Sequence, residues 1–160
     1  MPLTRRHLFT AVGASLFAFA PRQAAAVPTP PGRLITLNPA ERWFDSREPG
    51  GLSGKFSAGD ARTVAIGVNP TGFTGAVFLN LTITQTEGAG FVRAYPADES
   101  DFPPVQHHSN INWSEDGQTL ANLVLTQVGQ ESGVVFECGG AGRTHIVVDV
   151  MGYVPFYDTP

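Results

Sequence analysis

The chain has 160 residues, of which 15% are charged, with 10 Lys and Arg against 14 Asp and Glu. This length fits one domain, and a hydrophobic content of 42% excludes a disordered chain. One cysteine excludes an internal disulfide framework and a cysteine-cluster metal site. An acidic balance with a single lysine argues against nucleic acid as the partner.

The first 26 residues have the pattern of a cleavable export signal. Arg5 and Arg6 precede an apolar stretch at residues 8–20, which is the twin-arginine arrangement. A bilayer span needs about 20 apolar residues, so this shorter stretch favours a signal segment over a membrane anchor. The small residues Ala24 and Ala26 predict cleavage after Ala26.

Cleavage at that point sets the domain organisation and the expected location. We expect a Pro-rich leader at residues 27–33, one folded domain at 34–156 and a tail at 157–160. Without the signal the chain keeps 7 basic and 14 acidic residues, a formal charge of −7. Because the twin-arginine route carries folded proteins, we expect a secreted or envelope-associated domain with no membrane span after cleavage. Its lone Cys138 is then expected to be a small buried side chain.

Short runs of alternating apolar and polar residues recur after the leader and predict strands. Gly, Pro, Asn and Asp clusters separate these runs and predict turns. The fold class is therefore all-β, an antiparallel sandwich or flattened barrel of about 7–9 strands. The predicted strands are residues 62–68, 76–84, 91–95, 120–128, 134–137 and 145–153, with 34–37 and 42–45 as two further ones. Residues 98–112 contain several strand breakers and predict a long surface loop.

Four charged residues predict a structural ion pair between the first and last strands. Asp149 lies in the middle of an apolar strand, where a bare carboxylate is costly to bury, so it needs a basic partner. Arg47 and Arg42 are both possible partners, and Asp45 lies between them in the sequence. We expect the pair to be buried and the arginine to be stranded if Asp149 is removed.

Five amide side chains form a second polar set, Asn80, Asn110, Asn112, Gln118 and Asn122. One interpretation is that they satisfy backbone groups and fix loops, because unpaired buried amides cost about 1–3 kcal/mol each. The other is a sugar-binding face, in which amides pair with hydroxyls and an aromatic ring stacks on the sugar. For that face the predicted ligand-binding residues are Tyr95, Asn110, Asn112, Trp113 and Gln118, with Phe91 as a further stacking ring.

The sequence contains no nucleophile elbow, metalloprotease helix or phosphate loop. His107 and His108 are adjacent on an extended segment, so their rings point apart and predict no metal site without a third ligand such as Asp101 or Glu99. The alternative to a binding module is a small extracellular hydrolase. It would combine His145, or the His107–His108 pair, with Asp45 or Asp149 in a site assembled from loops.

Six motifs in one order resemble a known pattern. They are R-W-F-D-S-R at 42–47, A-V-F-L-N-L-T-I-T at 76–84, G-F-V-R-A-Y-P at 90–96, S-N-I-N at 109–112, G-Q-T-L-A-N at 117–122 and T-H-I-V-V-D-V-M-G-Y at 144–153. This resembles an all-β module of secreted actinobacterial proteins that often accompanies extracellular hydrolases or occurs in tandem. The resemblance implies no catalytic residue set, and Trp43 and Phe44 replace two aliphatic residues.

Together these observations predict a non-catalytic module of the cell envelope, without a cofactor and without a bound metal. The expected partners are cell-wall polysaccharide or another envelope protein, and self-association is a further expectation. Attraction to polyanions is not expected, because the domain is acidic.

Overall fold

The computed structural model describes residues 32–67, 74–97, 108–129 and 133–155. The predicted export signal with Arg5, Arg6, Ala24 and Ala26 lies outside these residues, as do most of the leader, His107 and the tail. The described chain forms strands and no helix. The strands are β1 (Ile35–Asp45), β2 (Phe56–Ser57), β3 (Ala61–Ala65), β4 (Thr74–Glu87), β5 (Gly90–Pro96), β6 (Ile111–Trp113), β7 (Leu120–Gln127), β8 (Gly133–Gly140) and β9 (Arg143–Pro155).

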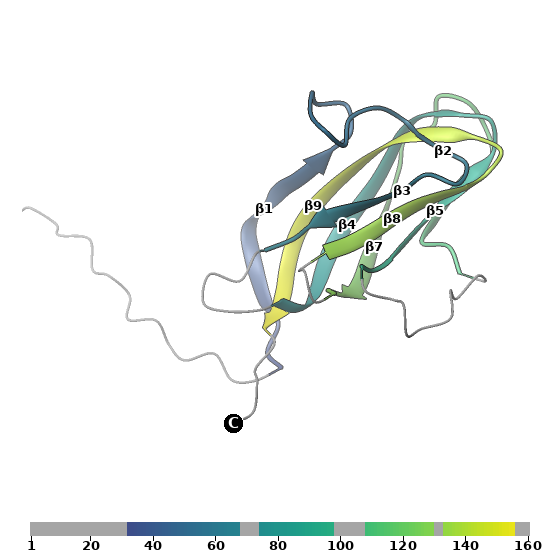
Figure 1. Ribbon diagram of the computed structural model, residues 1–160. Helices are drawn as coiled ribbons and strands as arrows, with labels where there is room; N and C mark the ends of the chain where they lie inside the picture. Colours follow the sequence, from purple (N-terminus) through teal and green to yellow (C-terminus); the bar gives the residue numbers. More distant parts are fainter. Residues whose placement is uncertain (1–31, 68–73, 98–107, 130–132, 156–160) are drawn as a thin grey trace, which may run out of the picture.

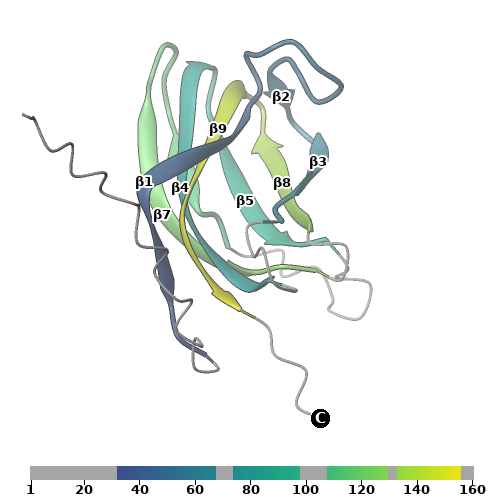
Figure 2. The same ribbon diagram turned by 90° about the vertical axis from the view of Figure 1, so that its left-hand side faces the viewer.

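The strands form two antiparallel sheets that pack face to face, which confirms the predicted sandwich and excludes the barrel alternative (Figure 1). The five-stranded sheet has the order β1-β9-β4-β7, and the short β2 pairs with β9. The four-stranded sheet has the order β3-β8-β5-β6. Figure 2 shows β7, β4, β9 and β1 in one layer and β5, β8 and β3 in the other.

The core lies between the two sheets, and the alternation of apolar residues builds it. In β4 the side chains of Val77, Leu79, Leu81 and Ile83 are fully buried, because every second residue of a strand points to the same face. Phe136 and other apolar residues of the four-stranded sheet fill the opposite wall. Cys138 is buried there as predicted, and burial raises the pKa of its thiol to about 11.

Three predicted segments differ from the structure. The stretches 34–37 and 42–45 belong to one strand, β1, whose register against β9 shifts between Thr36 and Glu41. This interruption contains the cis Asn38–Pro39 bond, and proline has no N–H to donate to the ladder. The short β2 was not predicted. The expected loop 98–112 is wrong at its end, because Ile111–Trp113 forms β6 beside β5, while 98–107 lie outside the described residues.

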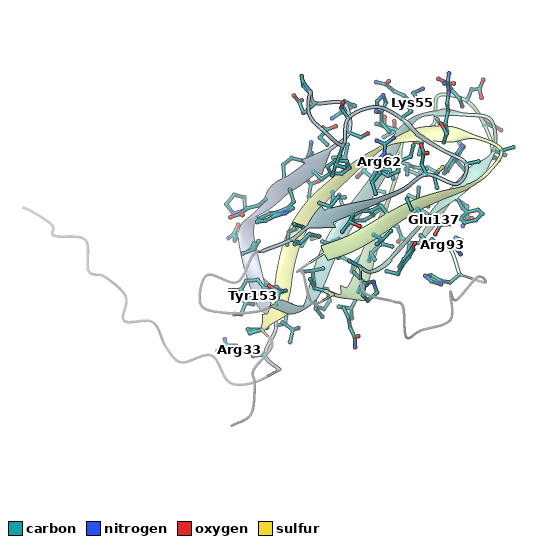
Figure 3. All side chains as sticks on the ribbon, in the orientation of Figure 1. Arg33, Lys55, Arg62, Arg93, Glu137 and Tyr153 are labelled. Atoms are coloured by element: carbon teal, nitrogen blue, oxygen red, sulfur yellow. The ribbon has the colours of Figure 1, made fainter. Side chains whose placement is uncertain are left out.

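Arg62 fixes the segment that connects β1 to β2 at one end of the sandwich. Arg62 of β3 donates hydrogen bonds to the carbonyl oxygens of residues 52–55 at 2.9–3.2 Å. Its guanidinium lies 4.0 Å from the centre of the Phe56 ring. Figure 3 shows Arg62 and Lys55 together at this end of the molecule, with Arg33 and Tyr153 at the other.

Candidate functional site

The predicted ion pair between the first and last strands is present, but its arrangement differs from the expectation. Arg42 of β1 donates to the carboxylate of Asp149 and, at 3.1 Å, to that of Asp45. Arg47 binds Asp45 instead, through its side chain at 2.8 and 2.5 Å and its backbone N–H at 3.0 Å. Of the two predicted partners of Asp149, Arg42 is therefore correct and Arg47 is wrong.

The burial of this cluster was also overestimated. The carboxylate of Asp45 is 5% exposed, whereas the arginine side chains are 51% and 43% exposed. The hydrogen bonds from Arg47 lower the pKa of Asp45 to about 2. The hydrogen bond to Asp149 raises the pKa of Arg42. The cluster ties the end of β1 to β9, and both of its carboxylates are occupied by arginines.

The predicted hydrolase residue His145 has a serine neighbour that sequence reasoning missed. The Ser46 hydroxyl lies 2.9 Å from Nδ1 of His145 and accepts a hydrogen bond from the Ile146 backbone N–H at 3.0 Å. Burial, followed by the nearby cations Lys55 and Arg47, lowers the pKa of His145. Ser46 is fully buried, so its hydroxyl is not open to a substrate carbonyl in this arrangement. The contact connects the residue that follows β1 with β9, and it forms no accessible nucleophile.

Three of the predicted amides bind backbone groups. Asn110 accepts a hydrogen bond from the Ala94 N–H at 2.7 Å, and Gln118 accepts two from residues 114 and 115. Asn122 donates to the Asn110 carbonyl oxygen at 2.6 Å and bridges the edges of the two sheets. These contacts match the interpretation that the amides fix loops. Of the other two, Asn80 is partly buried and donates to the Thr82 hydroxyl at 3.4 Å. Asn112 has an exposed side chain that accepts a hydrogen bond from Ser109.

The expectation that Trp113 offers an exposed stacking surface is wrong. Its side chain is 5% exposed and packs over Gly90, where a Cβ atom would overlap the indole ring. Within the described residues its indole N–H finds no hydrogen-bond acceptor. The position of Trp113 at the end of a predicted loop suggested exposure, but its place in β6 turns the ring into the core.

The outer face of the four-stranded sheet brings together the residues that remain. Phe91, Arg93 and Tyr95 alternate along β5 and lie opposite Gly139, Glu137 and Val135 of β8. On the other side of β5, Asn112 of β6 lies opposite Phe91. We call Phe91, Arg93, Tyr95, Asn112 and Glu137 the β5–β8 face. Figure 3 shows Arg93 and Glu137 side by side on it.

The polar centre of this face is a network around one carboxylate. Arg93 donates two parallel hydrogen bonds to Glu137, at 3.0 and 2.5 Å, and the Tyr95 hydroxyl donates a third at 3.0 Å. The bonds from Arg93, and then that from Tyr95, lower the pKa of Glu137. The charges are therefore balanced within the pair, and fixed planar groups lie on the sheet surface.

The rings of the face lie at either side of this network. The Phe91 ring covers Gly139, where a Cβ atom would overlap the ring, so it lies against the sheet and remains partly exposed. Tyr95 is four residues further along β5, about 14 Å away along the strand. Sequence reasoning included Phe91 and Tyr95 but missed Arg93 and Glu137. Their alternate positions in V-R-A and F-E-C were the available signal.

The described residues contain no group of three His, Cys, Asp or Glu side chains placed to hold a metal ion. Across the same residues no helix is long and apolar enough to cross a membrane. Comparisons of the chain with protein-family models, curated proteins and solved structures found no match.

Proposed function

We propose that the protein is a non-catalytic module of the cell envelope, exported by the twin-arginine route, that binds a neutral glycan on the β5–β8 face. One observation carries the proposal: two partly exposed rings, Phe91 and Tyr95, flank a fixed Arg93–Glu137 pair on the outer side of one sheet, where the two charged side chains are 15% and 21% exposed. The resemblance to modules of secreted actinobacterial proteins supports the cellular location.

This arrangement suits a sugar chain for chemical reasons. The C–H face of a pyranose ring is apolar and packs on aromatic rings, which here lie along a single strand. Between the rings the guanidinium and carboxylate groups, and beside Phe91 the Asn112 amide, offer donors and acceptors for sugar hydroxyl groups. An extended oligosaccharide that follows β5 would contact both rings and the network between them.

The charges of the face favour a neutral ligand over a charged one. Arg93 is matched by Glu137, so no unbalanced positive charge is presented to an anion. The chain as a whole carries an excess of acidic residues, which repels polyanions. We therefore expect binding that changes little with salt concentration, in contrast to binding driven by phosphate or nucleic acid.

The test is retention of the protein on purified peptidoglycan and neutral cell-wall polysaccharide, with a glycan array to define the sugar. Phe91→Ala and Tyr95→Ala should each weaken retention by about tenfold or more, because each removes a stacking surface. Phe78→Ala is the matched control, since Phe78 is partly buried on the outer face of the other sheet. Equal retention of all three variants, or retention that collapses at high salt, contradicts the proposal.

A further inference from the structure

The outer edge of β7 is an open strand that carries exposed leucines. In the part of the chain that the structure describes, β7 pairs with β4 on one side and with no strand on the other. Figure 2 shows it on the outer side of β4. Leu123 and Leu125 are 58% and 60% exposed, although both belong to a regular strand of 8 residues. Such an edge has backbone N–H and C=O groups available for another strand.

This edge lacks the features that usually prevent strand pairing. Its sequence, L-A-N-L-V-L-T-Q, contains no charged residue and no proline. The apolar surface continues inward on the same face, because Leu125 lies opposite Phe78 of β4, and Met151 of β9 is 43% exposed. The charged pair of this sheet, Arg42 and Asp149, lies further in, because Asn80 of β4 stands between Asp149 and Leu123. The edge itself is therefore apolar and uncharged, which suits a protein strand.

We propose that β7 pairs antiparallel with β7 of a second copy of this chain, about a two-fold axis at Val124. In that register Leu123 of one copy lies opposite Leu125 of the other, and the reverse contact repeats it. Four leucines then form one apolar cluster on the outer face of a continuous sheet. The inference is independent of the proposed glycan binding, which uses the opposite face of the sandwich.

The charge distribution around β7 allows this pairing despite the acidic character of the chain. Among the described residues, the acidic residues nearest the strand in the sequence are Glu115 and Asp116, in the turn that precedes it. Antiparallel pairing places the two acidic turns at opposite ends of the new strand pair, about 27 Å apart for 8 residues. This exceeds the screening length of about 8 Å at physiological salt, so the turns repel each other little. A single strand-to-strand contact is small, and we expect a Kd in roughly the micromolar range.

The test is sedimentation velocity over a concentration series, with the protein purified in the form that its cells release. Wild type should form a dimer, and Leu125→Lys should weaken dimerisation by about tenfold or more, because it places two lysines in the leucine cluster. The matched control is Leu52→Lys, which adds the same charge at a position that is 38% exposed but outside the sheets. It should dimerise as wild type does.

A charge-swap pair tests the register itself. The double variants Leu123→Glu with Leu125→Glu, and Leu123→Lys with Leu125→Lys, should each be monomeric, and their mixture should form heterodimers. Both positions are exposed, so folding should be retained, which circular dichroism verifies. A monomeric wild type, dimers that persist in Leu125→Lys, or a mixture that stays monomeric would each overturn the proposal. A monomer would mean that any strand that covers this edge belongs to a different protein.

Discussion

At the scale of single residues, the role of Trp113 changed most between sequence and structure. Exposed aromatic residues near amides suggest a sugar contact, but here the ring fills the end of the core. Its indole N–H has no acceptor within the described residues, and an unpaired buried donor costs about 1–3 kcal/mol. The ring is therefore important for its volume and not for its polar group.

Two substitutions at this position separate the two effects. Trp113→Ala should lower the free energy of unfolding by about 3–5 kcal/mol, because it leaves a large cavity. Trp113→Phe keeps most of the ring and removes the unpaired N–H, so its cost should stay below about 1.5 kcal/mol. Urea denaturation measures both. A phenylalanine variant as unstable as the alanine variant would show that the indole N–H is bonded after all.

Asp45 makes stability dependent on acid. Arg47 holds the pKa of its carboxyl at about 2, below the ordinary value of 3.8. A depressed carboxyl pKa stabilises the fold above the ordinary value, and this contribution is lost as the pH falls from about 4 to about 2. It corresponds to about 2 kcal/mol for this largely buried group.

We therefore expect Asp45→Asn to be less stable than wild type at neutral pH and to lose less stability between pH about 4 and about 2. Chemical denaturation at a series of pH values measures the difference. Glu41→Gln is the control, because Glu41 is an exposed carboxylate on the same strand, whereas Arg47 binds Asp45. If the free energies of unfolding of wild type and Asp45→Asn fall equally over that pH range, Asp45 does not cause the acid dependence of stability.

At the scale of elements, the register between neighbouring strands decides which of the predicted ion pairs form. Arg42 and Asp149 lie directly opposite each other in β1 and β9, whereas Arg47 lies beyond the end of β1. Because Arg42 is about half exposed, water screens the pair and lowers its energy.

A double-mutant cycle with Arg42→Ala and Asp149→Ala should give a coupling energy of about 1 kcal/mol. The equivalent cycle with Arg47→Ala and Asp149→Ala is the control and should be additive within about 0.5 kcal/mol. Coupling in the second cycle and not in the first would assign Asp149 to Arg47.

At the scale of the whole molecule, the sandwich offers two outer faces of different chemistry. The β5–β8 face has rings around a charged network, and the opposite sheet ends in an uncharged strand with exposed leucines. The double layer keeps both faces in place without a disulfide, which suits the export in a folded state that we propose.

The export signal that the sequence predicts can be tested at this scale. Arg5→Lys together with Arg6→Lys should abolish export, because the twin-arginine pattern depends on both residues. Protein released by wild-type cells should begin near Val27. Intact mass and N-terminal analysis of the extracellular fraction measure both results. A wild-type chain that stays at full length in the cytosol would contradict the predicted export.

The sequence alone was sufficient for the all-β class, the positions of most strands and the burial of Cys138, and it left the sandwich and the flattened barrel as alternatives. These features depend on the alternation of apolar and polar residues within each strand. Because that pattern involves only residues close in the sequence, it can be read without the tertiary structure. The amides were predicted in part: their type showed that they need partners, but not which face they occupy.

Only the tertiary structure decided which distant residues meet. Arg93 and Glu137 are 44 residues apart, and Arg42 and Asp149 are 107 apart, so their contact depends on strand order and register. The same holds for Trp113, because pairing of β6 with β5 determines that its ring points inward. Alternation along one strand fixes which residues share a face. The order of the strands within each sheet fixes which strands supply that face, and no local sequence pattern encodes the strand order.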